Sequence, residues 1–139
     1  MSKMSKALTI GEVAATIGVS THTLRYYERA GLMLDPVARA ESGHRRYSER
    51  DVGWVVFLTK VRKTGMSIRR MRDYAALVRT GQGNEHQRLA LLETHRKEVL
   101  EHVLETQRNL RAIERKIKTY RDRISVLENE FVDPTVRVA

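Results

Sequence analysis

The stretch from Ser20 to Leu32 carries side chains whose types and spacing suggest a specific chemistry. His22, Arg25, Tyr26 and Arg29 are spaced i, i+3, i+4 and i+7, so a helix places them on one face. Arginines on such a face donate hydrogen bonds to base edges and to phosphates. The pattern therefore predicts a nucleic-acid-binding surface, although a solvated surface helix with two arginines explains this stretch alone equally well.

The residues before this helix predict the element that positions it. Thr9 and Glu12 are spaced as a capping box, and an apolar stripe follows at Ile10, Val13, Ala14 and Ile17. Ser20 is a suitable N-cap for the second helix, and Gly31 suits its C-terminal end. Two helices joined by a tight turn at Gly18 to Ser20 indicate a helix-turn-helix, whose second helix lies in the major groove.

The pattern I-G-E-V-A-x-x-I-G-V-S-x-x-T-L-R-Y-Y-E-R-x-G-L, residues 10–32, resembles the opening of a MerR-type transcriptional regulator. The resemblance implies a homodimer that binds double-stranded promoter DNA at a near-palindrome. It further implies that the dimer bends and untwists a promoter with an overlong spacer so that RNA polymerase engages both elements. Many metal-sensing relatives use cysteines near the end of the dimerisation helix, and this chain has no cysteine, which argues against thiolate metal sensing.

A basic hairpin is predicted after the second helix. Pro36 and Ser42-Gly43 divide residues 33–47 into two short arms, and G-H-R-R-Y-S at residues 43–48 resembles the wing of the family. The alternative is a flexible solvated loop. On the first interpretation, the arms bring basic and aromatic side chains to the DNA backbone: Arg39, His44, Arg45, Arg46 and Tyr47.

Two further helices complete the predicted DNA-binding domain, which we call the head. Ser48 caps a strongly apolar helix in which Trp54 is a core or interface residue, and the basic end of that helix, Lys60, Arg62 and Lys63, forms a second phosphate-contacting turn. A fourth helix, from Ile68 to about Thr80, contributes apolar residues to the core. The run Gly81-Gln82-Gly83 then marks the domain boundary.

A coiled-coil repeat runs from about Glu85 to Phe131 without proline or glycine. A helix of that length spans roughly 65 to 70 Å, so its apolar stripe needs a partner, most simply a second copy. Heptads leave the strand direction open, and the family resemblance implies an antiparallel pair. The residues predicted to form the dimer seam are Leu92, Val99, Val103, Leu110, Ile113, Ile117, Tyr120, Ile124 and Leu127.

Composition limits the class of protein. Of the net charge of +9, residues 1–84 carry +8, which favours nucleic acid over a membrane as the partner. No apolar run approaches the roughly 20 residues that span a bilayer, so we expect a cytoplasmic, nucleoid-associated protein without a membrane partner. No catalytic constellation is present, so we expect neither an enzyme nor a cofactor.

The sequence suggests two further candidate sites. His95 and His102 lie seven residues apart near Glu98 and suggest a metal site, but no further ligand is fixed by local spacing, so we predict none. A small-molecule effector is unidentified, and an apolar pocket for it would have walls at Trp54, Tyr74, Tyr120 or Phe131. Packing roles for all four residues are the favoured alternative.

Together these patterns predict a mostly α fold, in which a winged helix-turn-helix DNA-binding domain precedes a long coiled-coil dimerisation helix. The predicted ranges are an N-terminal tail (1–7), the DNA-binding domain (8–81), the long helix (85–131) and a C-terminal tail (132–139). The DNA-binding residues expected on the helix face are Thr21, His22, Arg25, Tyr26 and Arg29. Two other functions remain open: a sequence-indifferent architectural DNA-binding protein, and a DNA-anchored coil that docks another protein.

Overall fold

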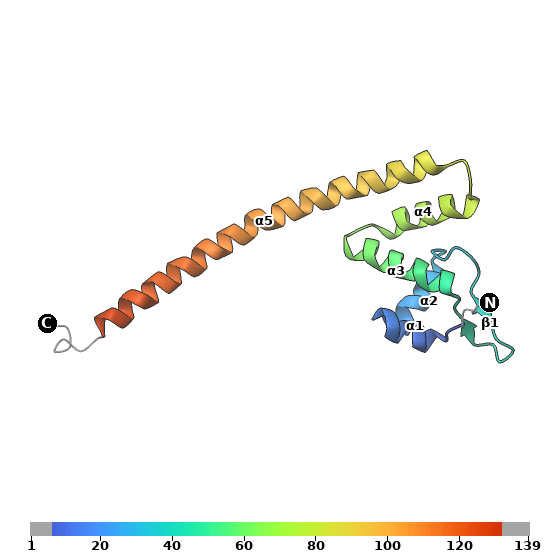
Figure 1. Ribbon diagram of the computed structural model, residues 1–139, viewed down its shortest axis with the longest axis horizontal. Helices are drawn as coiled ribbons and strands as arrows, with labels where there is room; N and C mark the ends of the chain where they lie inside the picture. Colours follow the sequence, from blue (N-terminus) through green and yellow to red (C-terminus); the bar gives the residue numbers. More distant parts are fainter. Residues whose placement is uncertain (1–6, 132–139) are drawn as a thin grey trace. The chain divides into compact units, whose positions relative to one another are not determined.

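The computed structural model describes residues 7–131, so the predicted tails lie largely or wholly outside the described residues. The order of elements is α1 (Ile10–Ile17), α2 (Thr21–Arg29), β1 (Ala38–Arg39), β2 (Arg45–Arg46), α3 (Glu49–Lys63), α4 (Ile68–Thr80) and α5 (Glu85–Glu130) (Figure 1). The predicted fold class, a mostly helical winged helix-turn-helix followed by a long helix, is confirmed.

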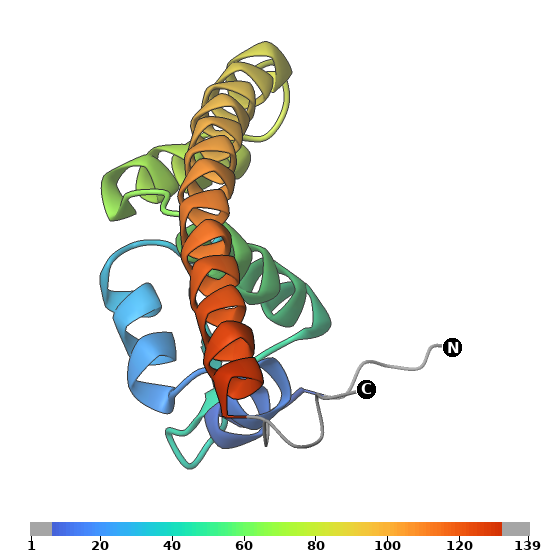
Figure 2. The same cartoon turned by 90° about the vertical axis from the view of Figure 1, so that its left-hand side faces the viewer.

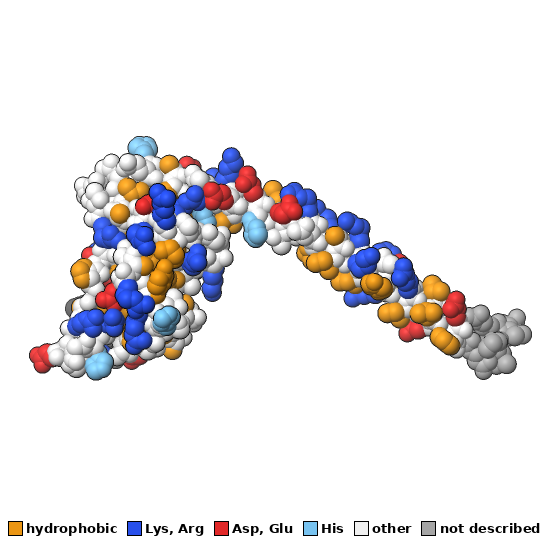
Figure 3. Space-filling view, turned by 180° about the vertical axis from the view of Figure 1, so that it is seen from behind, with side chains coloured by type: hydrophobic (Ala, Val, Ile, Leu, Met, Phe, Trp, Pro, Cys, Tyr) orange, Lys and Arg blue, Asp and Glu red, His pale blue; other side chains and the backbone are white. Residues whose placement is uncertain are grey.

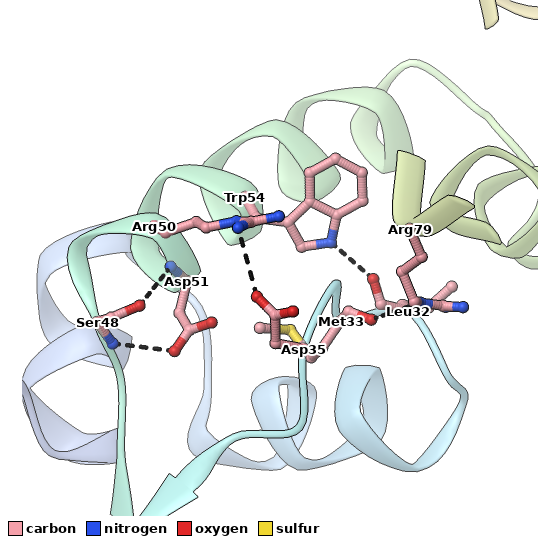
Figure 4. Close-up of polar contacts among 8 residues, drawn as sticks. All are labelled: Leu32, Met33, Asp35, Ser48, Arg50, Asp51, Trp54 and Arg79. Atoms are coloured by element: carbon pink, nitrogen blue, oxygen red, sulfur yellow. Dashed lines mark hydrogen bonds and ion pairs between the residues drawn. The ribbon is translucent and has the colours of Figure 1, made fainter. Parts of the chain in front are cut away.

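Side-chain caps explain where the helices begin. At α1, Thr9 and Glu12 form the predicted capping box, with reciprocal hydrogen bonds of 2.8 and 3.1 Å. Ser48 and Asp51 form a second capping box at α3, drawn in Figure 4. Each cap satisfies backbone N–H groups that have no partner within the helix, and losing one costs about 1 kcal/mol.

The tight turn between α1 and α2 depends on Gly18. This residue ends α1 in the left-handed conformation, with φ of 85°, and its N–H donates to the Ala14 carbonyl at 2.8 Å. A side chain at this φ is strained, which is why glycine suits the position. Helices α1 and α2 consequently lie side by side, as Figures 1 and 2 show.

The hydrophobic core of the head is formed by one face of each of the helices α1 to α4. The buried side chains include Val13 from α1, Leu24 and Tyr27 from α2, Val55 from α3 and Met71 from α4. Fully burying a side chain of the Leu or Val type contributes about 1.5 to 3 kcal/mol. This packing holds α2 with its opposite face toward solvent.

The wing is a two-stranded antiparallel hairpin. Ala38 pairs with Arg46 and Arg39 pairs with Arg45, which confirms the predicted hairpin over a solvated loop. The base of the hairpin is fixed by Leu8, which exchanges two backbone hydrogen bonds of 2.8 Å with Tyr47. The chain just before α1 is therefore joined to the second arm of the wing.

The chain divides into two compact units, of which the first ends at Arg96. The helical pattern does break at Gly81, as predicted. Packing nevertheless continues into α5, because Leu91 and Leu92 contact the core of the head and His95 is 8% exposed. Leu92, predicted for the dimer seam, is therefore also part of the head.

The second unit contains α5 from Lys97 onward. Its apolar side chains are exposed in the single chain, between 42% and 57%, at Val103, Leu110, Ile113, Ile117, Tyr120, Ile124 and Leu127. Figure 3 shows orange side chains recurring along this half of the helix among blue ones. Across residues 7–131, no helix combines the length and the apolar character that a membrane crossing requires.

Candidate nucleic-acid interface

Helix α2 separates its side chains as the spacing predicts. Leu24 and Tyr27 are buried at 1% and 4%, whereas His22, Arg25, Tyr26 and Arg29 are exposed. The Ser20 hydroxyl accepts a hydrogen bond from the Thr23 N–H at 3.0 Å and fixes the start of the helix. Thr21, the first residue of α2, is partly exposed beside this cap. The helix therefore presents cationic and aromatic groups on one open face.

A hollow of about 300 Å³ lies between this face and the wing. Arg25 lines it from α2, while His44, Arg45 and Arg46 line it from the hairpin. Thr9 and Ile10, at the N-terminal end of α1, complete the wall. Cationic side chains beside a helix N-terminus form a favourable environment for a phosphate group. The fold thus brings together four of the predicted DNA-binding residues.

Glu28 is an acidic residue on α2 that connects the helix to both arms of the wing. Its carboxylate accepts a hydrogen bond from the Arg45 Nε and lies 3.9 Å from an Arg39 guanidinium nitrogen. Arg39 also donates to the Gly43 carbonyl at 3.0 Å, within the hairpin. Both arginines were predicted as DNA contacts, and in this structure they also hold the wing against the recognition helix.

The sequence prediction for Tyr47 is corrected by the structure. Its side chain is 1% exposed and packs in the core, so it does not face the open surface with Arg46. Tyr47 directly follows β2 and pairs with Leu8, and its ring packs in the hydrophobic core. Burial raises the pKa of the Tyr47 hydroxyl, and the negative charge of Glu28 raises it further.

The predicted basic residues lie in the last turn of α3, and their contacts differ. Lys60 and Lys63 are exposed, whereas Arg62 donates to the Met66 carbonyl at 3.0 Å across the turn. Arg62 therefore joins the end of α3, which carries the two lysines, to the loop that follows it.

His95 has a structural contact in the head. Thr64 donates its hydroxyl hydrogen to the Val61 carbonyl at 2.9 Å, so its oxygen accepts from the His95 Nε2–H at 2.8 Å. Within the described residues, no group of three or more His, Asp or Glu side chains is arranged to hold a metal ion.

The predicted effector walls on the head form an aromatic cluster. The Trp54 and Tyr74 rings stack, with centroids 5.9 Å apart and planes 9° apart, and Phe57 packs against both. The Trp54 Nε1–H donates to the Leu32 carbonyl at 2.6 Å, as Figure 4 shows. These contacts give Trp54 and Tyr74 packing roles.

Sequence reasoning missed three residues of this region: Glu28, Arg72 and Arg79. Arg72 and Arg79 project from α4 onto the loop that follows α2. Glu28 lies three residues after Arg25, so its position on the second helix could be predicted from the sequence. Its pairing with the wing depends on Arg39 and Arg45, which lie 11 and 17 positions away, and periodicity does not reveal such contacts.

A basic recognition helix, a wing and a shared cationic hollow define a winged helix-turn-helix DNA-binding protein. Residues 8–77 match the sequence profile described as "MerR HTH family regulatory protein". An HTH-type transcriptional regulator of Haemophilus influenzae is 35% identical over 112 residues, which cover 81% of this chain and 82% of that protein. The chain therefore belongs to the MerR family of helix-turn-helix transcriptional regulators.

Solved structures agree with this assignment. A MerR family transcriptional regulator from Listeria monocytogenes superposes with a TM-score of 0.82 at 35% identity, covering 95% of this chain and 99% of that one. HiNmlR, described as a MerR family regulator lacking the sensor domain and bound to promoter DNA, has a TM-score of 0.78 at 32% identity. That match covers 86% of this chain and 94% of HiNmlR.

Proposed function

We propose that this regulator binds a near-palindromic promoter operator as a homodimer and controls transcription by bending and untwisting the DNA. The observation that supports this most directly is the hollow shared by Arg25 of α2 and His44, Arg45 and Arg46 of the wing. A phosphate in the hollow would fix the register of α2, whose exposed face then meets base edges in the major groove. HiNmlR is bound to promoter DNA in its structure, which supports promoter DNA as the partner of this chain.

The homodimer follows from the exposed apolar stripe of α5. Side chains from Val103 to Leu127 have no cover within the described part of the chain, and a second copy supplies matching apolar residues. The proposed seam runs from Leu92 to Leu127, and Leu92 also packs against the core of the head. Two heads would then contact two half-sites, and the DNA deformation, which costs a few kcal/mol, would be offset by the doubled contacts.

RNA polymerase is the proposed partner at the promoter, because MerR-type regulation acts on the spacing of promoter elements. Response to a small-molecule effector stays a prediction from the family resemblance. The stacking of the Trp54 and Tyr74 rings supports packing roles for these two candidate wall residues. Tyr120 and Phe131 are 53% and 85% exposed in the single chain.

The first experiment measures binding of the full chain to the DNA upstream of its own gene and to a scrambled duplex, at two salt concentrations. A site-specific regulator binds the native duplex more tightly, and its preference survives added salt. Counterion release alone gives salt-sensitive binding without preference. Equal binding to both duplexes, repeated with duplexes selected from a random pool, would support the architectural alternative and contradict our proposal.

Arg25→Ala tests the proposed recognition face. Because Arg25 joins the exposed face of α2 to the hollow, its removal should weaken specific binding by about 1 to 3 kcal/mol. Fluorescence anisotropy with the preferred duplex measures the change, and helical circular dichroism confirms folding. Unchanged affinity would remove Arg25 from the interface.

A further inference from the structure

Helix α4 contributes two arginines to the loop that follows the recognition helix. The Arg72 Nε–H donates to the Ala30 carbonyl at 2.9 Å. Arg79 spans two carbonyls, donating from Nη2 to Gly31 at 2.6 Å and from Nε to Met33 at 3.2 Å. Figure 4 shows the Arg79 side chain entering from α4 beside Met33 and Leu32. Three donor groups of α4 thus converge on residues 30–33.

These carbonyls lie at and just after the C-terminal end of α2. Helix α2 ends at Arg29, and Ala30 is its C-cap. The last carbonyls of a helix have no intrahelical partner, and they carry partial negative charge. Hydrogen bonds from a guanidinium are charge-assisted, and its planar fork suits two acceptors at once. Arg72 therefore caps α2 at its C-cap residue, and Arg79 holds the loop that directly follows the helix.

Other contacts hold α2 at its start, in its middle and, through Glu28, against the wing. Ser20 caps the start, and Leu24 and Tyr27 anchor the middle. The helix has nine residues and is about 13 Å long, so movement of its last turn changes the angle at which Arg25 and Arg29 approach DNA. Base readout through paired hydrogen bonds tolerates shifts of only about 0.5 Å.

We propose that Arg72 and Arg79 are positioning residues for sequence-specific binding, which fix the C-terminal end of the recognition helix and do not contact DNA phosphates. The inference rests on the proposed function. The competing role for two exposed arginines is direct phosphate contact. In this structure the Nε of each arginine, and Nη2 of Arg79, already donate to protein carbonyls.

The test uses the full chain with Arg79→Lys, Arg79→Gln and Arg72→Gln. Lysine keeps the positive charge, but its single ammonium lacks the fork that spans two carbonyls. Affinities are measured for a duplex that the wild type selects from a random-sequence pool and for a scrambled duplex, over a range of salt. If the wild type selects no sequence from the pool, the proposed function as a site-specific regulator fails. That result is distinct from a failure of the present inference, which concerns only the variants.

We expect all three variants to bind the selected duplex about five- to tenfold more weakly, with scrambled-duplex affinity within about twofold of wild type and an unchanged salt dependence. Arg46→Gln, which alters the cationic hollow, serves as the reference and should weaken binding to both duplexes. Circular dichroism at the assay temperature establishes that each variant is folded.

Three results would overturn the proposal. Wild-type binding by Arg79→Lys would show that charge alone suffices. A parallel loss on both duplexes by Arg79→Gln, with the slope of log affinity against log salt reduced by about 0.9, would make Arg79 a phosphate contact. If each variant loses affinity for both duplexes in proportion to its unfolded fraction, the two arginines only stabilise the fold.

Discussion

Glu28 is the acidic residue through which α2 holds the wing. Its carboxylate pairs with Arg45 and lies near Arg39, yet its negative charge also opposes an approaching phosphate. Glu28→Gln should therefore have two opposite effects. Affinity for scrambled DNA should rise about threefold at low salt, while the preference for the operator should fall because the wing is no longer held.

Anisotropy measurements with operator and scrambled duplexes test this expectation. Glu41→Gln is the matched control, because Glu41 is exposed on the wing loop and the charge change is identical. If Glu28→Gln only reproduces the effect of Glu41→Gln on both duplexes, the ion pairs with the wing do not contribute to recognition.

Tyr47 permits a separate test of the correction made above. Its hydroxyl is buried and has no hydrogen-bond partner among the described residues, so Tyr47→Phe should leave the free energy of unfolding unchanged or raise it by about 1 kcal/mol. DNA affinity should not change. Loss of DNA affinity in this variant would restore the hydroxyl to the interface.

The same hydroxyl makes stability depend on alkaline pH. Its pKa is raised by burial from 10.0, so above pH 10 the unfolded chain releases the proton before the folded chain does. The folded state then binds more protons, and the free energy of unfolding falls as pH rises through this range. Urea unfolding between pH 9 and 11 should show that the free energy of unfolding falls less steeply with pH in Tyr47→Phe than in the wild type. Tyr26→Phe should show the same pH dependence as the wild type.

At the scale of elements, the contact between α3 and α5 joins the start of the long helix to the head. Thr64→Val removes the hydroxyl that accepts from His95 and donates to Val61, and it leaves a buried imidazole N–H without a partner. We expect a loss of about 1 to 3 kcal/mol in the free energy of unfolding. Thr80→Val is the control, because that hydroxyl also donates to a backbone carbonyl of its own helix, that of Ala76, but lies at the end of α4 away from His95. Equal losses would contradict a specific contact.

The elements themselves were largely predictable from local sequence, because their signals act over a few residues. Thr9, Ser20, Ser48 and Ser67 each cap the helix that follows them. In the stripe on α1, Val13 and Ala14 are buried, and Ile10 and Ile17 pack partly buried against the core. The extent of the head was not predictable in this way. Leu92 fits the heptad pattern of α5 and also contacts the core of the head, and a repeat does not distinguish these two environments.

At the scale of the whole molecule, the exposed stripe of α5 predicts association. Ile117→Asp places a carboxylate in the proposed seam, where burying a charge is costly, and should convert a dimer to monomers in sedimentation equilibrium. Thr119→Asp adds the same charge outside the stripe and should leave the dimer intact. A monomeric wild type, or an Ile117→Asp dimer of unchanged stability, would contradict the proposed seam.

The hydrogen bonds between Leu8 and Tyr47 have a practical consequence. They fix the chain just ahead of α1 at the base of the wing, and the next two residues, Thr9 and Ile10, line the cationic hollow. An affinity tag or fluorescent fusion placed upstream of Leu8 is therefore tethered close to the surface proposed to receive DNA. Binding constants for this protein are best measured after such a fusion has been removed, particularly when the tag is charged.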